Sequence, residues 1–189
     1  MTDIRILLTP LSIVWVASEI ILARAKRSKI TDTRRDRASL VTLWTTISVS
    51  VTTGVIIGMQ NRGHFSSHLV AIATTGIVLI ALGLALRWIA IFSLGRLFTV
   101  DVAITQGHQL VHTGIYRVLR HPSYSGSLLS FLGLGLAFAS YLSVAIIFIP
   151  ICVAFLYRIH VEEKALIATF GDEYLKYRAS TKGLIPGIW

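Results

Sequence analysis

Five apolar blocks, separated by polar segments, set the first constraint on how this chain can fold. They cover residues 4–23, 40–59, 69–92, 125–139 and 142–157 of the 189-residue sequence. An α-helix rises about 1.5 Å per residue, so a block of roughly 20 residues crosses the ~30 Å hydrocarbon core of a bilayer. Only 14% of the residues are charged, whereas soluble domains carry about 25%. The sequence therefore predicts an all-α integral membrane protein with about five transmembrane helices.

Basic residues lie just outside the apolar blocks and predict the orientation of the chain. Lys and Arg gather in the polar segments 24–37, 93–124 and 158–189, whereas the other two connections carry only Arg62. With five spans, the three basic segments fall on one side of the membrane, which the positive-inside rule assigns to the cytoplasm. The N-terminus is then outside. Anionic lipid headgroups account for the net charge of +9, so we do not expect a nucleic-acid partner.

The blocks divide the chain into a first part, residues 1–92, with three helices, and a second part, residues 93–189, with most of the polar chemistry. No small-residue cleavage site follows a short hydrophobic region in the first block, so we interpret it as a retained helix. Structural pairing, with a neighbouring base or a cytoplasmic-end hydroxyl, is favoured over a functional role for its one acid, Glu19. Cys152 is the only cysteine, and no Cys/His spacing predicts a metal site.

The motif GIYRVLRHPSYSG, just before the fourth block, contains the first cluster of polar and aromatic residues. Pro122 disfavours a helical conformation for His121 and is itself favoured in the first turn of a helix. Arg120 and His121 should therefore lie at the N-terminal mouth of the fourth helix, whose amides favour a carboxylate or another anion. The spacing equally favours an Arg/His collar that contacts lipid phosphate.

A second cluster, formed by Arg158, His160, Glu162 and Glu163, lies at the foot of the fifth block. Arg158 and Glu162 are four residues apart, so a simple ion pair on one helix face is one explanation. That explanation leaves two adjacent acids at the membrane edge unaccounted for. Because the turn at residues 140–141 is very tight, the last two blocks should form a hairpin that brings the clusters together. Such a site is suited to binding a charged cofactor and an apolar substrate together.

The tail beyond the fifth block has the spacing of an amphipathic helix. Leu166, Phe170, Tyr174 and Tyr177 recur every three to four residues, with charged residues between them. We expect this helix to continue the fifth span out of the membrane, with Gly171 as an interruption or a cap.

These segments carry a resemblance to a known family. SLGRLFTV, then GHQLVHTGIYRVLRHPSYSG, then a two-helix hairpin and EEKALIATFGDEYLKYRASTKGLIPGIW are similar to the isoprenylcysteine carboxyl methyltransferase family. This family belongs to a wider group of membrane methyltransferases that includes phospholipid N-methyltransferases. The likeness covers about residues 93–189 and is weaker at WVASEIILARAKR. The combination of RHPSY, EE and FGDEYLKY at this spacing is what makes it specific.

The resemblance implies S-adenosylmethionine as the methyl donor and S-adenosylhomocysteine as the product, bound by a cytoplasmic loop under a lid made by the tail. It implies a catalytic set in which Arg158 steers the acceptor carboxylate, and Glu162 together with Glu163 contacts the cofactor. The implied cofactor-binding set is His108, Leu110, Val111, Tyr116, Arg120, His121, Pro122, Ser123, Tyr124 and Glu162.

The expected reaction is carboxyl O-methylation of a lipophilic, isoprenylcysteine-like acceptor. Methyl transfer depends mainly on holding the reactants in line. A carboxylate is ionised at neutral pH, so no strong general base is needed. The expected partners are this acceptor and membrane lipid, and no obligatory protein partner is evident.

Other functions stay open at this point. They are methylation of a lipid amine or a small thiol, NADPH-dependent reduction of the sterol-reductase kind, and a non-catalytic membrane role. The sequence has no Gly-rich strand–helix turn of the kind that cradles a dinucleotide. Where the family has VP before its final loop, this chain has Thr181 and Lys182 followed by GLIPG. Eukaryotic relatives also have more membrane helices, so the resemblance does not fix the acceptor.

Overall fold

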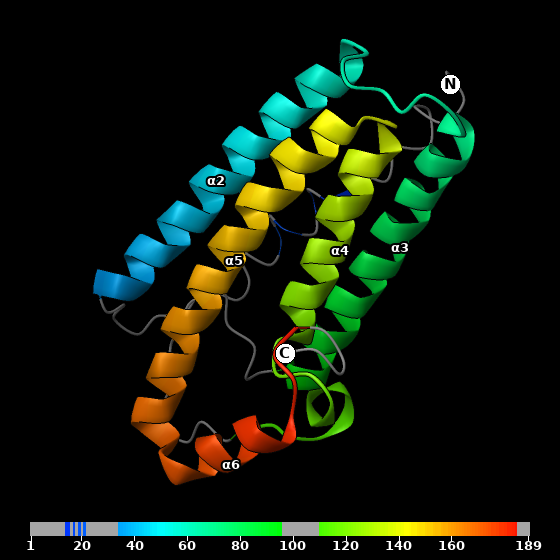
Figure 1. The fold of residues 1–189 in the computed structure, drawn as a ribbon. Helices are drawn as coiled ribbons and strands as arrows, with labels where there is room; N and C mark the ends of the chain where they lie inside the picture. Colours follow the sequence, from blue (N-terminus) through cyan, green and yellow to red (C-terminus); the bar gives the residue numbers. More distant parts are fainter. Residues whose placement is uncertain are drawn as a thin grey trace.

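A computed structural model describes residues 14, 15, 17, 19, 21, 34–95 and 110–184 of the chain. In this part the regular structure is entirely helical (Figure 1). The α-helices are α2 (Arg34–Met59), α3 (Leu69–Leu94), α4 (Pro122–Ala137), α5 (Tyr141–Phe170) and α6 (Asp172–Ser180), and a 3₁₀ helix, η2 (Gly114–Arg117), precedes α4. The predicted all-α fold is therefore confirmed.

Three of these helices are long and apolar enough to cross a membrane. They are α3, α5 and the Arg37–Met59 part of α2. Helix α4 has 16 residues, which is shorter than a full span. The predicted first span falls mostly outside the described residues, although Val14, Trp15, Ala17, Glu19 and Ile21 are helical.

The helices pack as two pairs, α3 along α4 and α2 along α5, and the turn between α4 and α5 joins the pairs (Figure 1). The apolar core lies between the pairs and includes Phe131, Ile147 and Phe155. Trp15 belongs to the same core, with its ring centroid 4.9 Å from that of Phe131. Trp15 therefore packs inside the bundle against α4, the helix that begins at the first polar cluster.

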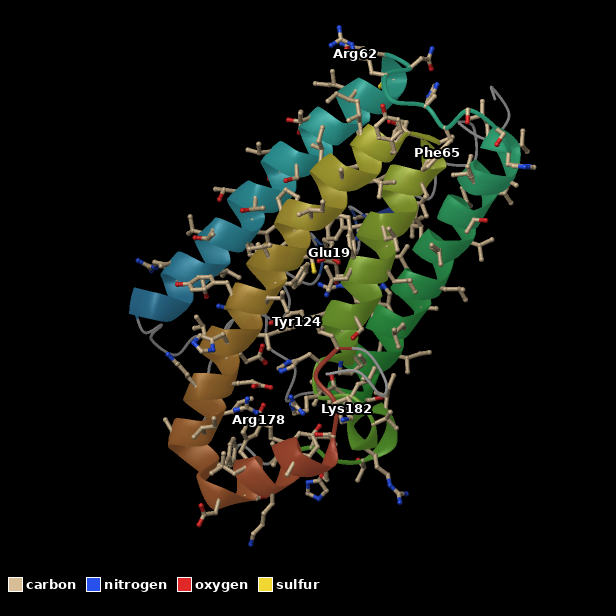
Figure 2. All side chains as sticks on the ribbon, viewed as in Figure 1. Glu19, Arg62, Phe65, Tyr124, Arg178 and Lys182 are labelled. Atoms are coloured by element: carbon tan, nitrogen blue, oxygen red, sulfur yellow. The ribbon has the colours of Figure 1, made fainter. Side chains whose placement is uncertain are left out.

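The predicted hairpin of the last two blocks is confirmed, and a second loop closes onto its turn. Ala139 has a positive φ of 49°, and the Ser140 hydroxyl accepts a hydrogen bond from Ser143 N. The loop after α2 reaches this turn, because Ser140 Oγ donates to Arg62 O at 2.7 Å and Phe65 N donates to Ala139 O at 3.0 Å. Figure 2 shows Arg62 and Phe65 at the end of the bundle opposite Tyr124. These contacts hold the α4–α5 turn against the loop after α2.

The predicted fifth span and the start of the tail form one continuous helix of 30 residues, α5, which ends at Phe170. The expected break at Gly171 is confirmed: its φ is 51°, which favours glycine. Helix α6 then turns across the end of the bundle (Figure 1). Because α5 continues so far, it carries the acid pair to the level of the segment that precedes α4.

Four glycines let α3 and α4 pack so closely that the backbone of one helix contacts the backbone of the other. A Cβ at Gly83 would lie 2.5 Å from Gly126 O, and a Cβ at Gly126 would lie 2.6 Å from Gly83 O. Gly76 and Gly133 repeat the arrangement two turns away, with Cβ-to-carbonyl distances of 2.6 and 2.5 Å. Small residues at helix crossings are typical of membrane bundles, where close packing replaces the hydrophobic effect as the driving force.

Replacing Gly126 by alanine should therefore destabilise the bundle. The added methyl group meets backbone on α3, so the helices must separate, at a cost of about 1–3 kcal/mol. The measurement is the thermal unfolding of Gly126→Ala in detergent, with Ala81→Val on the exposed face of α3 as the control. Equal melting temperatures for the two variants would contradict the close approach.

Candidate functional site

The polypeptide before α4 is held by the polypeptide after α6. Arg120 N donates to Lys182 O at 2.7 Å, His121 N donates to Gly183 O at 3.1 Å, and Lys182 N donates to Val118 O at 3.1 Å. Leu119 and Lys182 form a parallel bridge. Figure 2 shows Arg178 and Lys182 at the end of the bundle toward which Tyr124 lies. The tail therefore covers the end of the bundle that carries both predicted clusters.

Glu163 is where the two clusters meet. Its Oε1 lies 2.9 Å from Arg120 Nε and 3.3 Å from His121 Nε2, and its Oε2 lies 3.5 Å from Arg178 Nε. Arg120 also donates through Nη1 to Arg178 O at 3.1 Å and to Thr181 O. The side chains of Glu163, Arg120 and His121 are all less than a tenth exposed. This buried carboxylate links α5, the start of α4 and α6.

Glu162, the other acid of the pair, is in a more open setting. Its side chain is 28% exposed, against 8% for Glu163. Tyr124 donates a hydrogen bond to Glu162 Oε2 at 2.8 Å. His121 Nδ1 lies 3.9 Å from the same oxygen, and the rings of His121 and Tyr124 stack at 5.6 Å and 14°. Glu162 therefore presents a carboxylate beside two stacked rings.

Arg158 is fully buried one turn earlier on α5. Its Nη1 donates to Ser39 Oγ on α2 at 2.6 Å, and Ser39 is itself completely buried. The sequence did not single out Ser39, because a serine next to a span is common and nothing in the pattern places α2 beside the second cluster. His160, the remaining member of that cluster, is exposed.

Three buried tyrosines, Tyr116 on η2 and Tyr174 and Tyr177 on α6, carry neutral hydroxyl groups at this end of the bundle. Tyr177 donates to Tyr116 O at 2.7 Å, and burial raises the pKa of Tyr177 to about 12. Burial, reinforced by the Glu162 charge, also raises the pKa of Tyr116, whose hydroxyl donates to Ala90 O at 3.3 Å. Burial and the nearby Glu163 carboxylate raise the pKa of Tyr174. All three hydroxyls stay protonated at physiological pH.

The remaining described residues of the predicted cofactor-binding set lie at the same end of the bundle. Pro122 is fully buried in the first turn of α4, and Ser123 beside it is buried. Leu110 and Val111 are half-buried, and Leu110 lines an open hollow of about 480 Å³ against α6. His108 lies outside the described residues. The described members of the predicted set thus converge on the end of the bundle that α6 covers.

An ion pair between Glu19 and Arg87 lies next to the predicted cofactor residues, and only its acid was expected from the sequence. The predicted pairing of Glu19 is confirmed, and its partner is Arg87 on α3, with Arg87 Nε 2.6 Å from Glu19 Oε1. The sequence analysis did not single out Arg87, although a lone arginine within the apolar block 69–92 is an available signal.

Among the described residues, no group of three or more His, Cys, Asp or Glu could hold a metal ion.

The fold and the site together define a class: a multi-pass, all-helical membrane protein with a lidded polar cluster at one end of its bundle. The chain belongs to the isoprenylcysteine carboxyl methyltransferase (ICMT) family, whose sequence model matches residues 74–168, about half of the chain. The family resemblance seen in the sequence is therefore confirmed.

Individual relatives agree with the family match. Protein-S-isoprenylcysteine O-methyltransferase B of Arabidopsis thaliana is 33% identical over 119 residues, which cover 62% of this chain and 60% of the relative. Protein-S-isoprenylcysteine O-methyltransferase of Saccharomyces cerevisiae is 37% identical over 115 residues, which cover 60% of this chain and 48% of the relative. The chain thus matches about half to three fifths of the length of these relatives.

A solved structure supports the fold. The eukaryotic intramembrane Ras methyltransferase ICMT, solved without a monobody, superposes with a TM-score of 0.55 and 23% identity. The superposition covers 85% of this chain and 55% of that one.

The contacts of Glu163 predict that it stabilises the lid more than Glu162 does. Glu163→Gln leaves the buried Arg120 charge without its carboxylate, and breaking a buried ion pair in this way typically costs about 3–5 kcal/mol. Glu162→Gln should cost less, because the Glu162 side chain is more exposed. Thermal unfolding and limited proteolysis of α6 in detergent measure both effects. Equal losses in the two variants would contradict a special role of Glu163 in the lid.

Proposed function

We propose that this protein is an S-adenosylmethionine-dependent membrane methyltransferase that methylates the carboxylate of an isoprenylcysteine-like acceptor. The observation that carries the proposal is the meeting of the His121–Tyr124 segment with Glu162, one turn from the buried Arg158 on α5, in a chain of the ICMT family. The names of the relatives give this activity for those proteins. For this chain, the contacts of His121, Tyr124 and Glu162 support it.

The residues present fit the donor. S-adenosylmethionine supplies, when bound, a methyl group activated on a sulfonium, and it also carries an ammonium and an adenine. The partly exposed Glu162 carboxylate suits the cationic groups, and the stacked rings of His121 and Tyr124 suit a flat or cationic partner. Leu110, Val111 and Tyr116, with His108, would complete the set at the loop.

The acids of the pair have different roles in this proposal. Glu162 contacts the donor, whereas Glu163 serves as the internal counter-ion of Arg120, His121 and Arg178. A buried carboxylate surrounded by Arg120, His121 and Arg178 has less capacity for a ligand than the more exposed Glu162, which accepts one hydrogen bond from Tyr124 and lies 3.9 Å from His121 Nδ1. This division changes the simpler expectation that both acids contact the cofactor.

Arg158 would hold the acceptor. A guanidinium binds a carboxylate through two parallel hydrogen bonds, and this contact both orients the acceptor and keeps it ionised. Ser39 fixes Nη1 from α2, so the guanidinium has a set position. With the acceptor carboxylate ionised, the protein need only align the two reactants and exclude water.

The finer membrane arrangement belongs to the same proposal. The first block and α4 would complete five spans, with residues 93–189 as the catalytic region and residues 1–92 as the helices that flank it. The site would face the cytoplasm and the N-terminus the outside, as the basic segments indicate. The lipophilic acceptor would then reach Arg158 from the membrane and the donor would reach Glu162 from water.

Binding of S-adenosylhomocysteine tests the donor site. Purified protein in detergent should bind this product, and His121→Ala or Glu162→Gln should weaken binding by tenfold or more, since each removes a contact to the ligand. Isothermal calorimetry measures the affinities, and Asp172→Asn, an exposed acid on α6, is the matched control. An unmodified protein that shows no binding heat would refute the proposed function.

Arg158→Ala tests the acceptor site. Turnover on an N-acetylated S-farnesyl cysteine should fall by at least a hundredfold, whereas the affinity for S-adenosylhomocysteine should stay within about threefold. Lys164→Ala, an exposed cation on the same helix, is the control. If Arg158→Ala also lost its affinity for S-adenosylhomocysteine, Arg158 would not be specific to the acceptor. If the unmodified protein methylated a lipid amine and not the farnesyl cysteine, the proposed class of acceptor would be wrong.

A further inference from the structure

A buried ion pair lies next to the proposed donor site but is not one of its assigned residues. Arg87 on α3 donates through Nη2 to Glu19 Oε2 at 2.7 Å, and its Nε lies 2.6 Å from Glu19 Oε1. The side chains are 11% and 19% exposed. Figure 2 shows Glu19 among the helices of the bundle. Ionised groups inside a membrane span are costly and are usually retained for a function.

The remaining nitrogen of Arg87 holds the first turns of α4. Nη1 donates to Ser127 Oγ at 2.8 Å, to Ser123 Oγ at 3.0 Å and to Ser123 O at 3.5 Å. Ser123 lies within the segment from His121 to Tyr124, whose rings and backbone form the proposed donor site. Arg87 therefore positions this segment from α3.

The charge of Arg87 also reaches the proposed donor site. It acts on the Tyr116 hydroxyl, where it opposes the rise in pKa that burial causes. S-adenosylmethionine has a net charge of +1 at neutral pH, from one carboxylate, one ammonium and one sulfonium, whereas S-adenosylhomocysteine has a net charge of zero. An uncompensated arginine at this position would repel the substrate form of the donor more than the product form.

We propose that Glu19 neutralises Arg87, so that Arg87 can position the start of α4 without repelling the sulfonium. Arg87 is then a positioning residue, and Glu19 is a residue that sets the preference of the donor site for substrate over product. This inference rests on the proposed methyltransferase function. It also gives the N-terminal segment a direct part in the site, because that segment delivers the carboxylate.

The size of the effect follows from the charges. Two unit charges about 10 Å apart, at an effective dielectric constant of about 20, interact strongly enough to change a dissociation constant on the order of tenfold. Glu19→Gln keeps the shape of the side chain but removes its charge. It should raise the dissociation constant of S-adenosylmethionine about tenfold relative to that of S-adenosylhomocysteine.

The test compares the two dissociation constants in a set of variants by calorimetry. The double variant Glu19→Gln/Arg87→Met removes both charges and should restore the ratio seen in the unmodified protein. Ser123→Ala/Ser127→Ala removes two acceptors of Arg87 and should weaken both ligands alike. Ser130→Ala removes another hydrogen bond between α4 and α3, from a fully buried serine to Ile80 O. It should lower the melting temperature and leave the ratio unchanged.

The outcomes distinguish an electrostatic effect of Glu19 on ligand binding from a general loss of structure. A Glu19→Gln protein that binds both ligands as before, or that weakens both equally, overturns the inference. If Glu19→Gln does not fold, Arg87→Met tests the inference alone. It leaves the Glu19 carboxylate without a counter-ion, so the ratio of dissociation constants should move in favour of S-adenosylmethionine. A ratio that moves in favour of S-adenosylhomocysteine would overturn the inference. An unmodified protein that binds neither ligand would refute the proposed function itself, which is a distinguishable result.

Discussion

The Glu163 carboxylate is the contact on which the candidate site depends. It lies on α5, and its partners Arg120, His121 and Arg178 come from the start of α4 and from α6. A buried carboxylate must be surrounded by donors and opposite charge, because desolvation otherwise excludes the ionised form. One acid therefore fixes three segments far apart in the sequence, and the backbone pairing of the tail with the segment before α4 adds to it.

Two features of the bundle let this contact form. The hairpin turn around Ser140 joins α4 to α5 at the far end, where Ser140 bonds to the loop after α2 and Ser143 bonds to Gly54 O on α2. The glycines between α3 and α4 then bring Arg87 within reach of Ser123 and Ser127. Close packing of α3 against α4 and the anchored turn between α4 and α5 thus determine where the polar groups meet.

Much of this arrangement could be predicted from the sequence, for clear physical reasons. The length of the apolar blocks 40–59, 69–92 and 142–157, Pro122 at the start of a helix, Gly171 at a break and the short turn at 140–141 are local signals, and the structure agrees with them. Contacts between distant segments carry no local signal. The Ser39–Arg158 hydrogen bond depends on α2 packing beside α5, and the different surroundings of Glu162 and Glu163 depend on where α6 lies.

Two acids at this end of the bundle are paired with cations of the protein: Glu163 with Arg120 and Arg178, and Glu19 with Arg87. Glu162 is more exposed than Glu163, accepts a hydrogen bond from Tyr124 and lies 3.9 Å from His121 Nδ1. Arg158 donates to Ser39 Oγ on α2, which orients its guanidinium. In the proposed reaction, Glu162 meets the cationic donor and Arg158 meets the acceptor carboxylate, and the pairing of Glu163 and Glu19 keeps the charges of those two acids from disturbing either ligand.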